Sequence, residues 1–173
     1  MYLGLLLLLM GCVSEDGAPS QDGQTFVRNQ LHAQAEEIAV LRASSLAALK
    51  GAETQRRTIS SEDATADARS AAHREAWAKL AEGRAYCEAS TRARRRLKDM
   101  AEGYLASPLL PENGVRESFT GATTMISGDI PCGQISAGFN TQFTINVIKS
   151  FEEQSARMLQ QENALVDALP EGA

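Results

Sequence analysis

The sequence has few aromatic residues, histidines and cysteines, and these shortages exclude several classes of protein. Aromatic residues make up 5% of the 173 residues, and the chain holds two histidines and three cysteines. Two histidines leave little material for a catalytic triad or a metal centre, and three cysteines are too few for a small domain held by many disulfides. No Gly-rich loop carries the lysine of a phosphate-binding motif. We therefore expect no catalytic residues, no metal site and no cofactor.

An excess of basic charge is also missing. The chain has 17 Lys and Arg residues against 22 Asp and Glu residues, a net charge of -5. This balance gives it no electrostatic reason to bind nucleic acid. The charge is divided along the chain, with +4 over 28–100 and -6 over 101–173. Opposite charges favour antiparallel packing of a helix at the end of the chain against the helical region before it.

Apolar runs are too short to cross a bilayer as a helix, which needs roughly 20 residues. The stretch from Gly4 to Cys12 is apolar throughout, and its length is typical of the core of a signal peptide. Its end, Leu9-Met10-Gly11-Cys12, resembles a bacterial lipobox, and this resemblance covers only the first twelve residues. It implies that 1–11 are removed, that the Cys12 thiol receives a diacylglycerol, and that the new amino terminus is acylated, with palmitate as the expected chain.

The resemblance also implies a location. Several acyl chains together anchor a protein firmly in a membrane. Residues 12–23 are polar, acidic and rich in Gly and Ser, which is typical of a flexible tether. Val13 is not the aspartate that retains lipoproteins of enteric-type bacteria in the inner membrane. We therefore expect an outer-membrane protein, held by its lipid anchor and facing the periplasm.

Proline is absent from 24–107, where Ala, Glu, Arg, Gln and Leu predominate, as they do in helices. Two apolar stripes at helical spacing run along this region, and each predicts a face that packs against a partner helix. The first stripe is Val27, Leu31, Ile38, Leu41, Ala48 and Ala52, interrupted by Gln34 and Ser45. The second, with Trp77 beside it, is Ala76, Leu80, Gly83, Cys87, Ser90, Leu97, Ala101 and Tyr104.

Between the stripes, 60–76 contains no apolar residue larger than alanine. Two arrangements are compatible with this weak segment. One is a single helix of about 80 residues, about 120 Å long; the other is two helices joined near 51–60, with Ser60 to Asp63 as the N-cap and first-turn acids of the second. We favour the single helix. Since a last helix of about 30 residues covers only about 45 Å of it, the single helix predicts self-association into a homo-oligomer.

Two prolines and an Asn-Gly pair end the helical region after residue 107. A Gly/Pro-rich loop is predicted over 108–138, with Met125, Ile126 and Ile130 as its inward anchors. A last helix is predicted over 139–169, and its apolar face is Phe143, Val147, Phe151, Met158, Leu165 and Leu169. The predicted fold class is all-α: an elongated antiparallel helical hairpin or coiled coil of one long helix, continuous or broken, with a loop region and a C-terminal helix.

The cysteines predict one disulfide. If Cys12 carries lipid, Cys87 and Cys132 remain, and an even pair in an oxidising compartment is most simply bonded. The bond would tie the middle of the helical region to the loop before the last helix. Closing a loop of about 45 residues is worth about 3 to 4 kcal/mol in principle.

One dense basic run comprises Arg92, Arg94, Arg95, Arg96 and Lys98. On a helix, four arginines in five positions point to more than one face, so some can meet the acidic last helix while others bind an anionic partner. Lipid A phosphates, wall polymers and an acidic protein surface would all suit. A solvated, salt-bridged helix face is the alternative. No aromatic residue is interleaved for stacking on bases, so we expect no nucleic acid.

Together these features predict a non-enzymatic, lipid-anchored envelope protein that acts as a helical scaffold or protein-interaction module in the periplasm. One alternative is an inhibitor or ligand-binding lipoprotein that uses the disulfide-pinned loop, since long loops are often functional. Another is a phage lysis lipoprotein of the outer-membrane spanin kind, which the chain resembles only in architecture.

Overall fold

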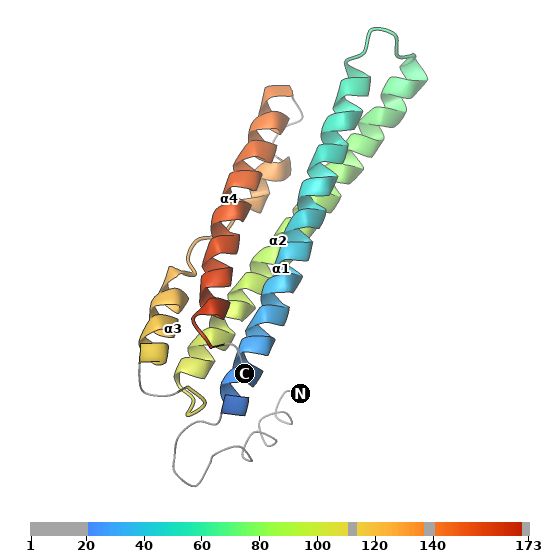
Figure 1. The fold of residues 1–173 in the computed structure, drawn as a ribbon. Helices are drawn as coiled ribbons and strands as arrows, with labels where there is room; N and C mark the ends of the chain where they lie inside the picture. The colour runs from blue at the N-terminus through green and yellow to red at the C-terminus, as the bar shows by residue number, and fades with distance from the viewer. Residues whose placement is uncertain (1–20, 111–113, 137–140, 171–173) are drawn as a thin grey trace. The chain divides into compact units, whose positions relative to one another are not determined.

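The computed structural model describes residues 21–110, 114–136 and 141–170, and within these ranges the chain is helical with no strand. The helices are α1 (Gln21–Ile59), α2 (Ala66–Leu105), α3 (Gly114–Met125) and α4 (Thr141–Asp167), with a short 3-10 helix, η2 (Cys132–Ser136), before α4 (Figure 1). The predicted all-α hairpin class is confirmed. The predicted signal peptide, 1–11, lies outside the described residues. Helix α1 begins at Gln21, so the last three residues of the tether predicted for 12–23 belong to a helix.

The helical region predicted for 24–107 consists of two helices, so the preference for a single one is wrong. The chain turns back at 60–65. The side chain of Thr65 caps α2, because its Oγ1 accepts the N–H of Ala68 at 3.2 Å. Arg69 donates to the carbonyls of two residues in the turn, at 3.1 and 3.2 Å. These bonds satisfy backbone groups that a helix end leaves unpaired. They stabilise the turn in a segment where breaking the helix loses little buried apolar area.

Self-association was expected because part of a single long helix would have had no partner helix within the chain. In the structure α1 and α2 form a hairpin, so that premise does not hold. The joint also lies later than the expected 51–60, and the predicted cap at Ser60 to Asp63 is replaced by the one at Thr65.

The predicted loop over 108–138 is wrong for its central part, which is the helix α3. This helix buries Phe119, Ala122 and Thr123 on one face. Its glycines and β-branched threonines are weak helix formers, so its composition hides it. The threonine hydroxyls bond within the helix, and Thr123 Oγ1 donates to the carbonyl of Phe119 at 2.8 Å. Burial of the Phe119 face therefore outweighs the low propensity.

The anchors predicted in this segment are partly confirmed. Ile126 is 2% exposed and Ile130 is 7% exposed, as expected of inward side chains. Met125, at the end of α3, is 49% exposed, so its prediction as an anchor is wrong. Successive residues of a helix lie about 100° apart around its axis. Ile126 comes three residues after Thr123 and seven after Phe119, so it continues the buried face, whereas Met125 does not.

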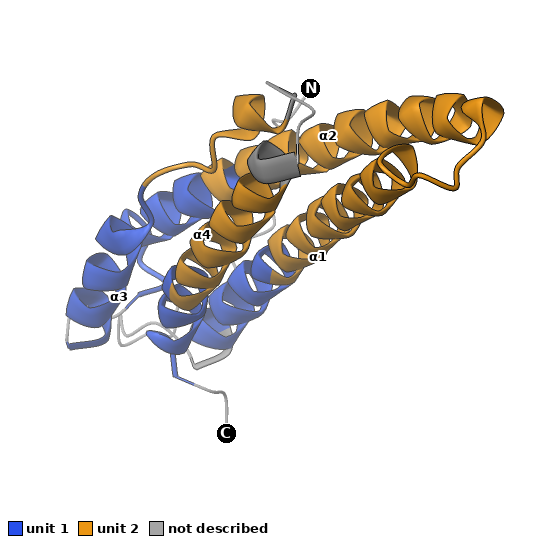
Figure 2. Ribbon diagram, turned by 90° about the horizontal axis from the view of Figure 1, so that it is seen from above, with its two compact units in different colours: residues 1–35, 96–127, 161–173 blue, residues 36–95, 128–160 orange. Residues whose placement is uncertain are grey.

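The chain forms two compact units, and three of its helices contribute to both (Figure 2). Unit 1 comprises Met1–Ala35, Arg96–Ser127 and Gln161–Ala173. Its described core consists mostly of long apolar side chains, each 2% exposed or less: Val27, Leu31, Leu97, Leu110, Phe119, Ile126, Leu165 and Leu169.

Arg116 of α3 holds the end of α2 in unit 1. Its guanidinium donates to the carbonyls of Leu105 at 2.5 Å, Ser107 at 3.3 Å and Leu110 at 2.6 Å. Carbonyls at the end of a helix lack partners within the helix, and a cation there also favours the helix dipole. One side chain thus satisfies three backbone acceptors at the point where the chain leaves α2.

Unit 2 comprises Glu36–Arg95 and Gly128–Gln160. In it α1 and α2 run antiparallel and close together: Ser45 Oγ donates to the carbonyl of Gly83 at 2.7 Å. A Cβ at Gly83 would lie 3.4 Å from Leu49 Cγ and from the Ser45 carbonyl oxygen, so the small residue sets the approach of the helices. Helix α4 is antiparallel to α1, with Lys50 2.7 Å from Glu152, and therefore parallel to α2. The antiparallel packing predicted from the charges thus holds for α1 alone.

Candidate functional site

The predicted disulfide joins Cys87 of α2 to Cys132, the first residue of η2. The two Cα atoms are 5.7 Å apart and the bond spans 45 residues of sequence. Both cysteines are buried, at 0% and 8% exposure. They belong to one apolar cluster with Ile130 and Ile135 from the segment of Cys132 and Phe151 from α4, among others. The disulfide prediction is confirmed, and its burial makes it a structural fastening of the segment 128–136.

Two cations of the predicted basic run help to fasten the same segment. Arg94 is 4% exposed, and its Nη1 donates to the carbonyl of Gly128 at 2.6 Å. Gly128 has a φ of 74°, a left-handed conformation that suits glycine. Arg95 pairs with Asp129, and that hydrogen bond raises the pKa of Arg95. These two arginines therefore act within unit 2, although they were predicted as partner-binding residues.

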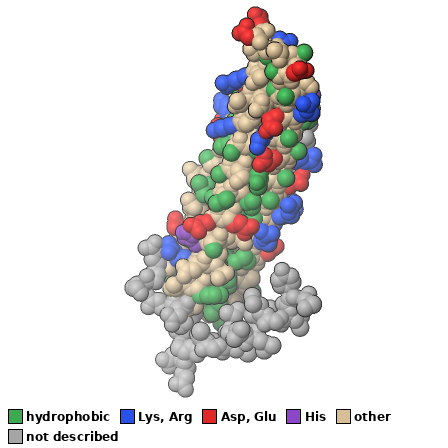
Figure 3. All heavy atoms as spheres, turned by 90° about the vertical axis from the view of Figure 1, so that its right-hand side faces the viewer, with side chains coloured by type: hydrophobic (Ala, Val, Ile, Leu, Met, Phe, Trp, Pro, Cys, Tyr) green, Lys and Arg blue, Asp and Glu red, His purple; other side chains and the backbone are tan. Residues whose placement is uncertain are grey.

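The other cations of the run are Arg92, Arg96 and Lys98. Arg92 and Arg96 are exposed, and Lys98, half-buried, lies 3.9 Å from Glu102 on its own helix. Arg92 forms no ion pair within the ranges that the structure describes. On the face presented in Figure 3, basic and acidic side chains are interspersed instead of forming one patch of a single sign.

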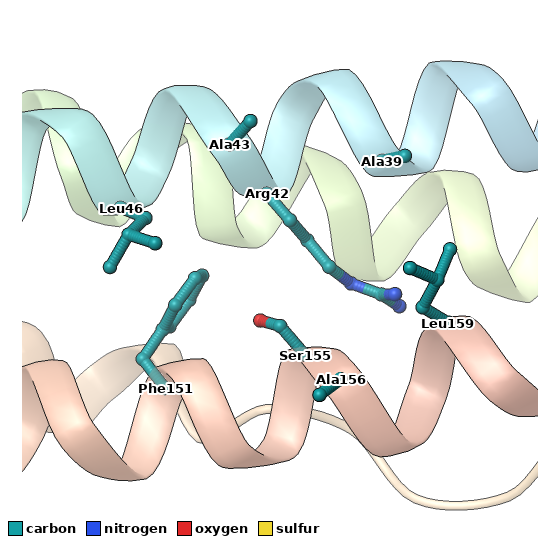
Figure 4. Close-up of a pocket in the computed structure, with 8 residues that line it drawn as sticks. All are labelled: Ala39, Arg42, Ala43, Leu46, Phe151, Ser155, Ala156 and Leu159. Carbon is teal, nitrogen blue, oxygen red and sulfur yellow. The ribbon is translucent and has the colours of Figure 1, made fainter.

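A pocket that the sequence analysis missed lies between α1 and α4 in unit 2 (Figure 4). Its volume is about 200 Å³. Two polar residues, Arg42 and Ser155, line it together with apolar ones. The apolar residues are Ala39, Ala43, Leu46, Phe151, Ala156 and Leu159.

The sequence carried a signal for this pocket. Arg42 follows Ile38 by four residues and precedes Ser45 by three, so it sits on the buried stripe of α1 at helical spacing. Ser155 likewise follows Phe151 by four residues on α4. A charged residue within an apolar stripe is unusual in a core unless it has a role there. The predicted stripe includes Gln34 and Ser45 as polar interruptions but not Arg42.

A second hollow, of about 400 Å³, lies further along the same two helices. Four of its charged side chains pair with one another: Lys50 with Glu152 at 2.7 Å, and Arg57 with Glu53 at 3.3 Å. Lys149 also lines it.

Within the described ranges, no helix is long and apolar enough to span a membrane, and no group of three or more His, Cys, Asp or Glu side chains could hold a metal ion. Cys12, the predicted lipidation site, lies outside those ranges. No family model, no curated protein and no solved structure matches this chain.

Proposed function

We propose that this chain is a non-enzymatic lipoprotein of the bacterial outer membrane, anchored at Cys12 and facing the periplasm, whose helical units bind another envelope protein. The observation that carries the proposal is the pairing of its cysteines. Of three cysteines, Cys87 and Cys132 are bonded to each other, so Cys12 is bonded to neither. The odd cysteine is therefore the one that ends the lipobox-like tetrapeptide Leu9-Met10-Gly11-Cys12.

The disulfide also supports an oxidising compartment. Disulfides persist in the periplasm and outside the cell, and they are rare in the cytosol of mesophiles. Because the Cys87–Cys132 bond is buried beneath η2 and α4 residues, it is not placed for a catalytic thiol exchange, which needs an accessible sulfur. The structural disulfide and the predicted signal peptide both support a location in the periplasm.

The surface proposed for the partner is the exposed part of the basic run on α2. Arg92 is the best probe of it, because it is exposed and unpaired within the described ranges. Arg95 is a poor probe, since its replacement would also break the pair with Asp129. Acidic side chains on the partner would match these cations, and arginine can bind a carboxylate through two parallel hydrogen bonds.

The anchor is tested by intact mass of protein extracted from bacterial membranes, with Cys12→Ala as the variant and the double variant Cys87→Ala/Cys132→Ala as the control. We expect the wild type and the control to lack 1–11 and to carry the lipid increments. Cys12→Ala should keep the full chain and lose the increments. An unprocessed and unlipidated wild type would contradict the proposed anchor.

The partner surface is tested by in vivo crosslinking with a photoreactive residue at position 92, and at position 74 as the control. Arg74 is an exposed arginine of the same helix. We expect one discrete adduct from position 92 only, and its loss in a chain that also carries Arg96→Glu. Equal adducts from both positions, or none from position 92, would contradict this surface.

A further inference from the structure

The groove between α1 and α4 in unit 2 holds two hollows, one after the other along the helices. Leu159 lines the pocket of about 200 Å³, and Ile145 and Ile148 line the second hollow of about 400 Å³. Figure 4 shows Leu159 projecting from α4 toward α1. Leu159 is 40% exposed and Ile145 is 44% exposed, whereas Phe151 and Met158 of the same helix are buried. Each hollow therefore has one exposed apolar side chain at its wall.

These two exposed side chains are placed symmetrically on α4. Ile145 and Leu159 are two heptads apart, with Glu152 midway between them. Residues at heptad spacing lie on nearly the same face of a helix. If a second copy of α4 lies antiparallel to the first, with its midpoint opposite Glu152, each Ile145 meets the Leu159 of the other copy. Such a contact is self-complementary, as a two-fold homodimer requires.

Two contacts set the register of α1 against α4. Lys50 lies 2.7 Å from Glu152, and one Nη atom of Arg42 lies 3.6 Å from Met158 Sδ. The helices are antiparallel, so each step up α1 is matched by a step down α4. This register also fixes which part of α1 a second copy of α4 would meet in the groove, since that copy would run parallel to α1.

The second copy would place an apolar side chain in each hollow. Its Ile145 would lie beside residues 39–46 of α1, which line the pocket, and its Leu159 beside residues 53–57, which line the second hollow. Because the contact is symmetric, the same two insertions occur on the second copy. Side chains of one helix that enter hollows between residues of another are the usual packing of antiparallel helices.

Charged side chains of α4 match this arrangement. Lys149 and Glu153 are exposed, and neither forms an ion pair or a hydrogen bond within the part of the chain that the structure describes. In the antiparallel dimer, Lys149 of one copy lies within one helical turn of Glu153 of the other, so two pairs of opposite charge form. Glu152, which meets its counterpart at the axis, is already paired with Lys50.

We infer that the groove between α1 and α4 binds α4 of a second copy of this chain, antiparallel and centred near Glu152. This reason for self-association differs from the unpaired long helix that the sequence predicted. The residues involved are also separate from the surface of α2 proposed for the envelope partner. Because the assays below need neither the lipid nor that partner, their failure would leave the proposed function unaffected.

The first test is sedimentation equilibrium of the full chain carrying Cys12→Ala. We expect a dimer at about 100 μM protein, where an interface of micromolar affinity is saturated. Leu159→Glu should raise the dissociation constant at least about 100-fold, because it buries a charge in an apolar contact twice in each dimer. A monomeric parent, or a dimer that Leu159→Glu does not weaken, would overturn the inference.

The matched control is Met125→Glu. Met125 is a large apolar side chain of α3, 49% exposed, and it lines neither hollow. We expect this variant to dimerise as the parent does. Equal weakening by Met125→Glu and Leu159→Glu would show that the association is not specific to the groove, and it would overturn the inference.

A charge swap tests the register. At low ionic strength, Lys149→Glu and Glu153→Lys should each raise the dissociation constant about five-fold, because each places like charges opposite one another in both pairs. The double variant Lys149→Glu/Glu153→Lys should return to within about two-fold of the parent. A role in the fold of the monomer would not produce this rescue. Additive weakening in the double variant would overturn the antiparallel register.

Cysteine crosslinking tests the orientation independently of any loss of affinity. Ile145→Cys and Leu159→Cys are introduced separately into the Cys12→Ala chain and are oxidised mildly, alone and as a mixture. A disulfide needs Cα atoms closer than about 7 Å, and in the antiparallel dimer residue 145 is near residue 159 of the other copy only. We expect crosslinked dimers from the mixture and not from either variant alone. Crosslinks within each variant alone, or none in the mixture, would overturn the inference.

Discussion

The two units of this protein are held together by different means. Unit 1 buries long apolar side chains, such as Leu31, Leu97 and Phe119, which are fully inaccessible to solvent. Unit 2 also buries large apolar side chains, in the cluster around Phe151, but it combines them with small residues on α1 and α2 such as Ala52, Ala76 and Gly83. Unit 2 also contains a disulfide and more buried charged groups than the described core of unit 1.

The difference shows the cost of close helix packing. Small side chains allow two helices to approach closely, but each buries little apolar area, and stability scales roughly with that area. The disulfide of unit 2, together with the ion pairs of Glu53 and of Arg95, adds fastenings that do not depend on area. Unit 1 should therefore be most sensitive to loss of a large side chain, and unit 2 to loss of a specific link.

The largest expected effect is in unit 1. Phe119→Ala removes a fully buried aromatic side chain and should lower the free energy of unfolding by about 3 to 5 kcal/mol. Met125→Ala, six residues along α3 and 49% exposed, should change it by less than about 0.5 kcal/mol. Chemical denaturation measures both. Equal effects of the two substitutions would contradict the packing of α3 described above.

Loss of the disulfide should rank second and act on unit 2. The double variant Cys87→Ala/Cys132→Ala opens a link that spans 45 residues, which should cost about 2 to 4 kcal/mol. Amide hydrogen exchange should accelerate first in 128–136, because this segment is held by that link. Cys12→Ala should leave both quantities unchanged. If exchange in 128–136 stays slow in the double variant, the ion pairs and isoleucines alone are enough to hold it.

Much of this comparison was visible in the sequence. The two stripes of 24–107 identified the helix faces, and the cysteine count identified the disulfide. Phe119 was missed because its helix contains Gly121 and several threonines, so local propensity pointed to a loop. Tertiary burial decided that segment, and a single sequence does not display tertiary burial.

The turn at 60–65 was underestimated for a related reason. The absence of proline favoured a continuous helix, and the alternative of two helices placed the cap at Ser60 to Asp63. The bonds that stabilise the reversal are instead those of Thr65 and Arg69. The pocket was missed because Arg42 and Ser155 interrupt apolar stripes that remain recognisable without them. The bonds of the turn are local, between residues at most eight positions apart, whereas the pocket joins α1 and α4, which are far apart in the sequence.

The packing of small residues in unit 2 is tested at two glycines of α2. A side chain at Gly83 would press on Leu49 and the Ser45 carbonyl, whereas a Cβ at Gly103 has nothing within 4 Å. Gly83→Leu should therefore destabilise the protein by about 1 to 3 kcal/mol through overpacking. Gly103→Leu should be neutral, or stabilising by up to about 1 kcal/mol, since glycine is a poor helix former. Thermal unfolding of both variants measures the difference, and similar values would argue against close approach at Gly83.

The smallest expected effect concerns Glu53, which is 7% exposed near the α1 end of the hairpin. Arg56 donates two hydrogen bonds to its carboxylate, each 2.8 Å long, and Arg57 adds a third at 3.3 Å. The bonds from Arg56 are the main reason that the pKa of Glu53 lies below its ordinary value, although burial opposes them. Glu53→Gln should cost about 1 to 2 kcal/mol near neutral pH.

This cost should depend on pH in a definite direction. The carboxyl of an unfolded Glu titrates near pH 4.3, and that of folded Glu53 titrates lower. Its contribution to stability is therefore fully present above the unfolded pKa and is lost as the pH falls through the folded pKa. Denaturation curves at pH 6 and pH 3 should show the difference between wild type and Glu53→Gln shrinking at the lower pH. Glu88→Gln, which breaks an exposed pair with Arg84, should differ little from wild type at either pH. A difference for Glu53→Gln that stays constant with pH would mean that shape, and not charge, makes Glu53 fit the hairpin.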